Sequence, residues 1–148
     1  MSDVLTLSQI KMPGTARRKD DAIREAGDIL VDAGAVEPEY IDSMFEREQS
    51  VSTYMGNYLA IPHGTNESKE SIKRSALSVV RYPEPIDWDG NEVLFALAIA
   101  GYQGGHMDIL SRIALVFSDT DEVDKLVAAG SADELYTLLH AVNEGDEA

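Results

Sequence analysis

The chain has 148 residues, of which 44% are hydrophobic and 26% are charged, a composition typical of a globular domain rather than a disordered or membrane protein. A chain of this length is expected to form one compact core. Its 27 acidic and 12 basic residues give a formal charge of −15, so nucleic acid is not an expected partner, because such a surface repels phosphates. The acidity fits either the choice of partner or a saline cytoplasm. The absence of cysteine excludes disulfides, thiolate metal ligands and cysteine nucleophiles.

The sequence leads us to expect neither a membrane span nor an export signal. The longest apolar run, residues 93–100, is far shorter than the ~20 residues that cross a bilayer. Residues 1–10 lack a basic region followed by an apolar stretch. We therefore expect a soluble cytoplasmic protein with no direct membrane insertion.

Two amphipathic helices are predicted in the first third of the chain. In residues 15–33, apolar side chains recur at spacings of three and four, and Gly34 suits a left-handed helix end. Pro38 fits the first position of a second helix, because proline has no N–H to leave unsatisfied there. Tyr40 and Met44 belong to the apolar stripe of this second helix.

Strands are predicted in the middle of the chain. Residues 53–55 and 58–61 are short extended segments separated by a Gly56-Asn57 turn signal. Residues 76–82 form a β-rich run, which we expect Pro83-Glu84-Pro85 to end, because proline cannot donate to a ladder. Residues 93–100 are apolar at every position, which indicates a central strand buried on both faces. The same residues also suit a buried helix, and their short length favours the strand.

Three more helices are predicted in the last third. Residues 106–119 carry apolar side chains at helical spacing, a second helix opens at Asp119 or Thr120 and ends at Gly130, and Ser131 caps a third that runs to about residue 142. The acidic residues 144–148 are expected to form a disordered tail. The alternation of helices and strands predicts an α/β fold, with residues 1–143 forming a single domain whose mixed β-sheet is layered by helices on both faces.

His63 is the first candidate for chemistry. It lies between Pro62, which stiffens the backbone, and Gly64, which leaves room for another molecule to approach closely. A histidine is mostly neutral at pH 7, so one ring nitrogen has a lone pair for nucleophilic attack. The alternative is a turn histidine that makes a structural hydrogen bond. His140 lies in a predicted helix with no special backbone beside it, and we assign it no role.

His106 is the second candidate. It follows Gly104-Gly105 and opens a predicted helix, where unpaired N–H groups and a partial positive charge favour an anion. The sequence therefore indicates a phosphate pocket at His106. The alternative is an exposed first-turn residue after a flexible loop.

Arg47 is the third candidate. It lies near the end of the second predicted helix, which leads directly into the strands before His63. A guanidinium there is placed to clamp a phosphate oxygen. Its neighbours Glu46 and Glu48 favour the alternative, an ordinary surface ion pair.

Other kinds of site are not predicted. His63 and His106 lie 43 residues apart among scattered carboxylates, which is a weak basis for a metal site, and we expect neither a metal nor a cofactor. The sequence has no GxSxG, no HExxH and no Gly-rich phosphate loop of the nucleotide-binding kind.

Residues 45–65, FEREQSVSTYMGNYLAIPHGT, resemble the signature of the enzyme IIA components of sugar phosphotransferase systems, of the mannitol/fructose type (the PTS EIIA type-2 domain). The similarity lies in the Arg-containing helix end, the S-T-Y-x-G turn and the I-P-H-G-T phosphorylation site. It continues through RYPEPIDWDGNEV and GGHMDIL to the final helices, and so covers nearly the whole chain.

The resemblance implies a cytoplasmic phosphotransferase component that works as a phosphoryl carrier. His63 matches the phosphorylated histidine, which accepts phosphate from phospho-HPr and passes it to a cysteine of enzyme IIB of a membrane sugar permease. His106 matches the second active-site histidine and Arg47 the nearby arginine, and both are expected to stabilise the phosphoryl oxygens. The position of Asn57 can be a glutamate in mannitol-type proteins, so an acidic partner for His63 at that point is not expected here.

Two alternatives belong to other functional classes. One is a regulatory IIA-like module, of the nitrogen or fructose type, in which phosphorylation of His63 controls the binding of a partner protein. The other is a structural binding domain without phosphorylation, which requires the signature to be a coincidence. The segments resemble the mannitol type more than the nitrogen-regulatory type, which favours transport.

Overall fold

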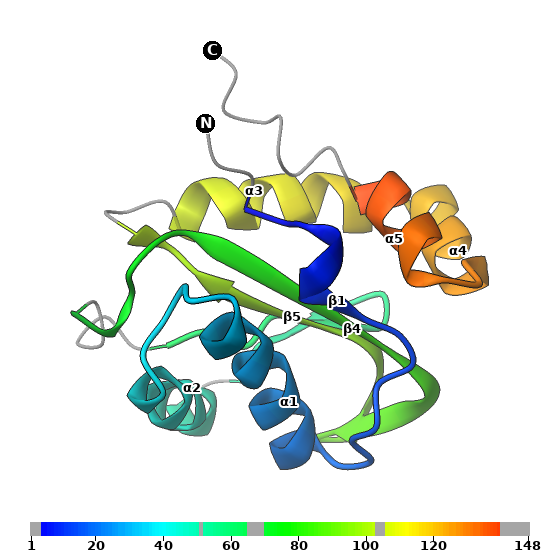
Figure 1. Cartoon of the computed structure of the whole chain (residues 1–148). Coiled ribbons are helices and arrows are strands. Elements are labelled where there is room, and N and C mark those ends of the chain that lie inside the picture. The colour runs from blue at the N-terminus through cyan, green and yellow to red at the C-terminus, as the bar shows by residue number, and fades with distance from the viewer. Residues whose placement is uncertain (1–3, 51, 65–69, 103–105, 140–148) are drawn as a thin grey trace.

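A five-stranded mixed sheet lies at the centre of the molecule (Figure 1). The computed structural model describes residues 4–50, 52–64, 70–102 and 106–139. The strands lie in the order β1-β4-β5-β3-β2, where β1 pairs parallel with β4, β4 antiparallel with β5, β3 parallel with β5, and β2 antiparallel with β3. Their bounds are Ile10–Lys11 for β1, Tyr54–Gly56 for β2, Leu59–Ala60 for β3, Ala76–Trp88 for β4 and Asn91–Ala100 for β5.

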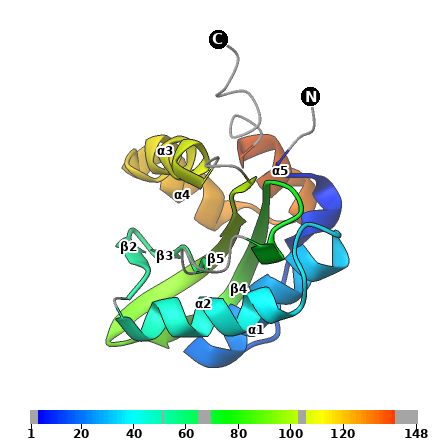
Figure 2. The same cartoon turned by 90° about the vertical axis from the view of Figure 1, so that its left-hand side faces the viewer.

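Helices cover both faces of this sheet, as expected (Figure 2). Helices α1 and α2 lie on one face, and α3, α4 and α5 lie on the other. A short 3-10 turn, η1 (Leu7–Gln9), precedes β1. The helix bounds are Lys19–Asp32 for α1, Glu39–Ser50 for α2, His106–Phe117 for α3, Thr120–Ala128 for α4 and Ala132–Leu139 for α5. The predicted acidic tail at residues 144–148 lies outside the described residues.

Strand β5 separates two hydrophobic cores, because its side chains alternate between the faces of the sheet. Phe95, Leu97 and Ile99 enter the core under α3, α4 and α5, whereas Ala96, Ala98 and Ala100 enter the core under α1 and α2. All six residues are fully buried, which confirms the prediction of a central strand. The short alanine side chains leave room for α1 and α2 to pack closely on the sheet.

Three of the predicted helix ends are confirmed, whereas the first helix begins at Lys19 and not at residue 15, and the predicted end of the last helix at about residue 142 lies outside the described residues. Gly34 has a φ of +76° just after α1, a left-handed conformation that glycine adopts without steric cost. The Asp119 side chain accepts a hydrogen bond from Asp121 N at 3.0 Å and caps α4. The Ser131 hydroxyl accepts from Glu134 N at 3.2 Å at the start of α5.

The prediction that Pro83-Glu84-Pro85 ends a strand is wrong, because β4 continues to Trp88. The pairing of β4 with β5 is irregular here: Arg81 pairs with Phe95 and Ile86 with Val93, so β4 has three more residues than β5 over this stretch. The two prolines are exposed within this irregular segment. They therefore avoid ladder positions that need an N–H donor, and the strand bends instead of ending.

Candidate functional site

His63 extends the β3 side of the sheet beyond the end of β3. It forms a parallel bridge with Ile99, near the carboxyl end of β5, and Ile99 N donates to Pro62 O at 3.1 Å. Pro62 is buried and His63 is half-buried. The predicted position of His63, just past the second short strand, is confirmed. The histidine thus lies in a short segment, residues 61–64, that is held directly against the central strand. This stretch is called the His63 segment below.

The ring of His63 is oriented by the backbone carbonyl of Ile61, two residues earlier in the chain. Its Nδ1 lies 2.8 Å from Ile61 O, and because a carbonyl oxygen only accepts, Nδ1 must carry the proton and donate. The lone pair of the neutral ring is therefore on Nε2. Ile61 N in turn donates to Thr53 O at 3.0 Å, so the accepting peptide is itself held in place. This is the structural hydrogen bond expected of a turn histidine, and it leaves the lone pair on Nε2, while the role of His63 as a nucleophile stays a prediction.

Tyr40 of α2 contacts the same segment, and sequence reasoning missed this role. Its hydroxyl donates to Ile99 O at 2.7 Å and accepts from Gly64 N at 2.9 Å. Burial raises the pKa of Tyr40 to about 12, although the hydrogen bond from Gly64 acts in the opposite direction. The hydroxyl therefore stays protonated at neutral pH. Its only signal in the sequence was a residue with a polar tip within an apolar helical stripe.

Arg47 lies on the same helix as Tyr40, seven residues later. Seven residues make almost two full turns, so Arg47 projects from nearly the same face as Tyr40, about 10 Å along the helix axis. The arginine is half-buried. The structure thus places Arg47 on the helix face that contacts the His63 segment, while its reach to a phosphoryl group on His63 stays a prediction.

His106 is the first residue of α3, the helix that follows β5 in the chain. Because His63 pairs with Ile99 near the carboxyl end of β5, the fold brings the His63 segment and the start of α3 to the same end of the sheet. The side chain of His106 lies outside the described part of the structure. The convergence of His63, His106 and Arg47 therefore stays a prediction.

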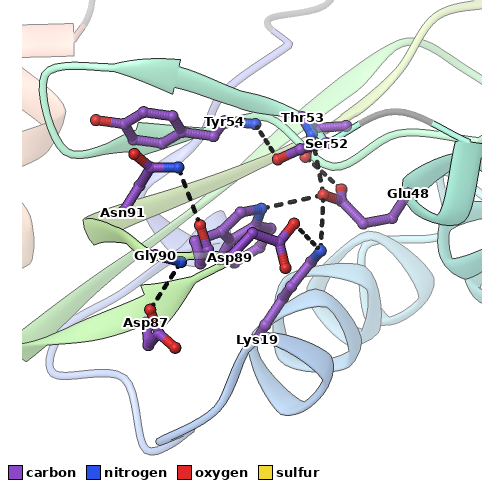
Figure 3. Close-up of polar contacts among 10 residues, drawn as sticks. Lys19, Glu48, Ser52, Thr53, Tyr54, Asp87, Asp89, Gly90 and Asn91 are labelled. Carbon is purple, nitrogen blue, oxygen red and sulfur yellow. Dashed lines mark hydrogen bonds and ion pairs between the residues drawn. The ribbon is translucent and has the colours of Figure 1, made fainter.

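Of the two glutamates beside Arg47 that favoured an ordinary surface ion pair, Glu48 is buried and does not form a surface pair. The carboxylate is only 4% exposed and lies at the centre of a polar network (Figure 3). It accepts hydrogen bonds from Thr53 N at 2.9 Å, Thr53 Oγ1 at 2.5 Å and Trp88 Nε1 at 3.1 Å, and Lys19 Nζ lies 3.3 Å from it. The bonds to Thr53 fix the connection between α2 and β2.

Lys19 extends the Glu48 network to two further elements. Its ammonium lies 2.7 Å from Asp89, in the turn between β4 and β5 (Figure 3). It also lies 5.7 Å from the centre of the Trp88 ring. The start of α1, the end of α2 and the β4–β5 turn are therefore joined through three charged side chains, Lys19, Glu48 and Asp89. Since Tyr40 is anchored at the other end of α2, the helix that carries Arg47 is fixed at both ends.

Asn57 has a structural task that a glutamate could not perform. Its side-chain amide donates to Phe117 O, at the end of α3, at 2.7 Å, and a carboxylate has no N–H for this bond. Leu59 pairs with Phe95 whereas His63 pairs with Ile99, so Asn57 lies toward the other end of β5 from His63. The Asn57 amide ties the β2–β3 turn to α3.

Two findings bear on other classes of protein. Within residues 4–50, 52–64, 70–102 and 106–139, no group of three or more histidine, aspartate or glutamate side chains is placed to hold a metal ion. None of the helices in that part of the chain is both long enough and apolar enough to span a bilayer.

Comparison with known proteins gives consistent results. The family model described as "Phosphoenolpyruvate-dependent sugar phosphotransferase system, EIIA 2" matches residues 3–142. The mannitol-specific phosphotransferase enzyme IIA component of Halalkalibacterium halodurans is 50% identical over 141 residues, which cover 95% of this chain and 97% of the relative. The protein of the same name from Staphylococcus aureus strain Mu50 is 46% identical over 139 residues, with 94% and 96% covered.

A solved structure agrees with these relatives. The complex of enzyme IIA-Mtl and phosphorylated enzyme IIB-Mtl from Escherichia coli contains a chain with 30% identity and a TM-score of 0.86, over 93% of this chain and 97% of that one. The family match thus spans nearly the whole chain, and the α/β architecture is shared. The chain belongs to the EIIA type 2 family of the phosphoenolpyruvate-dependent sugar phosphotransferase system.

Proposed function

We propose that the protein is a cytoplasmic phosphoryl carrier of a mannitol phosphotransferase system. In this role His63 accepts a phosphoryl group from phospho-HPr and passes it to the cysteine of a mannitol-type enzyme IIB during sugar uptake. The observation that carries the proposal is the hydrogen bond from His63 Nδ1 to Ile61 O, which assigns the lone pair to Nε2 at the end of a rigid strand segment. Membership of the EIIA family and the mannitol-specific names of two relatives support the choice of system.

The chemistry requires two displacements at phosphorus. In the first, His63 Nε2 forms a bond to phosphorus as the bond between phosphorus and the HPr histidine breaks. In the second, a thiolate of enzyme IIB forms a bond to phosphorus and the bond to Nε2 breaks. Phosphorylation at Nε2 withdraws electrons from the ring and strengthens Nδ1–H as a donor. The carbonyl of Ile61 therefore stabilises the phosphorylated ring while its orientation stays fixed.

Arg47 and His106 are proposed to stabilise the phosphoryl oxygens, because positive and hydrogen-bonding groups around these oxygens provide most of the catalysis in phosphoryl transfer. A carrier must also release its phosphate, so a small number of such groups fits the role better than a dense positive cluster. The solved relative in complex with phosphorylated enzyme IIB supports an enzyme IIB as the acceptor.

Incubation with phosphoenolpyruvate, enzyme I and HPr tests the proposal. The protein is expected to gain an acid-labile, base-stable phosphate, as a phosphohistidine does. His63→Ala is expected to take no label, whereas His140→Ala is a control for the loss of a histidine and is expected to label fully. Full labelling of His63→Ala would show that the assignment of the phosphorylated residue is wrong.

Onward transfer separates transport from regulation. When labelled protein is mixed with a mannitol-type enzyme IIB, the phosphate is expected to move to the enzyme IIB cysteine. Retention of all phosphate on the carrier would favour the regulatory alternative. His106→Ala is expected to keep some labelling but to slow the onward step, and an unchanged onward rate would remove the role assigned to His106.

A further inference from the structure

The hydroxyl of Tyr40 occupies a specific place in the sheet ladder beside His63. In a parallel bridge between His63 and Ile99, the two ladder bonds run from Ile99 N to Pro62 O and from Gly64 N to Ile99 O. The first is present at 3.1 Å. At the second, the Tyr40 hydroxyl bridges the same two groups, because it accepts from Gly64 N at 2.9 Å and donates to Ile99 O at 2.7 Å.

We propose that Tyr40 is a positioning residue for phosphoryl transfer, in which its bridging hydroxyl sets the place of the His63–Gly64 peptide against β5 and thereby the direction of His63 Nε2. This inference rests on the proposed function of His63. The Tyr40 hydroxyl bonds to Gly64 N and Ile99 O, so in this proposal it acts through the backbone on the carboxyl side of the histidine.

Several features suit Tyr40 to this task. Its side chain is only 2% exposed and packs in the core under α1 and α2. A tyrosine has only two side-chain torsions, so a packed ring holds its hydroxyl in a narrow range of positions. The carboxyl end of the same helix is anchored by Glu48 through Thr53 and Trp88. The hydroxyl is thus held by a helix that is itself fixed, and not by a mobile side chain.

The His63 segment is held at each of its neighbouring positions by a different partner. Ile61 N bonds to Thr53 O, Pro62 O accepts from Ile99 N, and Gly64 N bonds to Tyr40. Without the Tyr40 hydroxyl, the carboxyl side of His63 loses its bridge to β5, while the amino side keeps its bonds. Displacement of a reacting group by about 1 Å can slow a reaction by as much as ~100-fold.

Tyr40→Phe tests the inference, with Tyr82→Phe as a matched control. Tyr82 is also a fully buried tyrosine in the core under α1 and α2, but its hydroxyl donates to Glu25 at 2.9 Å and not to the His63 segment. Both variants lose one buried hydroxyl and keep the ring. The rate of phosphoryl transfer from phospho-HPr is measured by rapid quench at several concentrations of phospho-HPr, at a temperature at which circular dichroism shows both variants folded.

The expected result is a split between rate and affinity. Tyr40→Phe should lower the maximal transfer rate about tenfold and leave the half-saturating concentration of phospho-HPr unchanged, because the docking surface is intact while the nucleophile is less well aligned. Tyr82→Phe should change neither value. The inference would be overturned if Tyr40→Phe transferred phosphate at the wild-type rate, or if both variants were slowed equally.

Two NMR measurements test the positioning without any phosphate. In the wild-type protein, the Gly64 amide is expected to exchange slowly with solvent, and the ¹⁵N shifts of the His63 ring should report the tautomer with the proton on Nδ1. Tyr40→Phe should speed Gly64 exchange and alter the His63 ring shifts, and Tyr82→Phe should do neither. Gly64 exchange as fast as in an unstructured peptide would overturn the inference. These measurements remain decisive if the wild-type protein takes no phosphate, a result that would refute the proposed function alone.

Discussion

At the scale of single residues, Glu25 illustrates how donors around a carboxylate decide its protonation. It accepts hydrogen bonds from Thr15 N at 2.9 Å, Thr15 Oγ1 at 2.8 Å and Ala16 N at 3.2 Å, and Lys11 Nζ lies 2.7 Å away. Burial by itself raises the pKa of Glu25, but the bonds from Lys11, Thr15 and Ala16 outweigh burial and lower it to about 2. Glu25 therefore pins the segment before α1 to that helix in its charged form.

The pH dependence of stability follows from this lowered pKa. The folded pKa of Glu25 lies below the ordinary value of 4.5, so its contribution is complete above about pH 4.5 and is lost as the pH falls toward 2. We expect Glu25→Gln to lower the free energy of unfolding by roughly 2 kcal/mol at pH 7 and by much less at pH 3. Urea unfolding at both pH values measures this, with the exposed Glu92→Gln as control. An equal loss at both pH values would contradict the pKa argument.

Arg47 carries a residue-scale prediction about transfer. We expect Arg47→Ala to slow phosphoryl transfer from phospho-HPr by about 10- to 100-fold, because a cation that stabilises the phosphoryl oxygens is lost. Rapid-quench kinetics measure the rate, and the thermal midpoint should stay close to that of the wild type. Arg17→Ala removes the same charge from a side chain that is 78% exposed and should transfer normally. Collapse of the fold in Arg47→Ala would show instead that the arginine is structural.

At the scale of helices and strands, the sequence predicted elements whose signals are local. Gly34 and Asp119 predicted helix ends and the apolar run of β5 predicted a strand. These signals could be recognised because glycine conformation, helix capping and the burial of a strand depend on residues that are close together in the sequence. The end of the strand at Pro83 was predicted wrongly, since the irregular pairing that tolerates proline depends on β5. No helix or strand was predicted for the region that contains η1 and β1.

The polar network around Glu48 was not predicted, because its partners Lys19 and Trp88 are distant in the sequence. Helical spacing assigned residues to a face of α2, but it could not reveal that Trp88, 40 residues later, brings an indole N–H to the carboxylate. We expect Glu48→Gln to lower the free energy of unfolding by about 2–3 kcal/mol, because the buried Lys19 pair is broken and an amide nitrogen faces existing donors. Urea unfolding at pH 7 measures the loss.

The neighbouring glutamate provides the control for this prediction. Glu46 is exposed on α2, and Glu46→Gln should change stability by less than about 0.5 kcal/mol. Since Glu48 closes the connection from α2 to β2, amide exchange in residues 52–56 should also speed up in Glu48→Gln alone. Similar stability in the two variants would show that the Glu48 network contributes little.

In the complete fold, the proposed site lies at one end of the sheet, and the two hydrophobic cores, one on each face, stabilise that sheet. The alternation of large and small residues along β5 builds both cores at once, and the same strand presents Ile99 to His63. The sequence motif pointed to His63, Arg47 and His106 one by one. It could not predict Tyr40, because the contact of its hydroxyl with Gly64 exists only after α2 has packed on the sheet.

The formal charge of −15 yields a prediction that concerns the whole molecule. A folded chain of this length has a radius of gyration of about 15 Å, whereas charges interact over ~30 Å in 0.01 M salt and ~10 Å in 0.1 M salt. Repulsion among acidic groups therefore acts across the whole fold at low salt and only between neighbours at moderate salt. Exposed ion pairs such as Arg18–Asp21 also weaken in salt, but each contributes less than ~1 kcal/mol.

We therefore expect the thermal midpoint to rise by several degrees, on the order of 4 °C, between 0.01 M and 0.2 M sodium chloride at pH 7. Differential scanning calorimetry measures the shift. The double variant Glu92→Gln, Asp124→Asn changes two exposed residues and lowers the formal charge to −13, so it should show a smaller rise and a higher midpoint at low salt. A midpoint that falls with salt would mean that attractive ion pairs, such as those of Lys19 with Glu48 and Asp89, stabilise the fold more than the repulsion among acidic groups destabilises it.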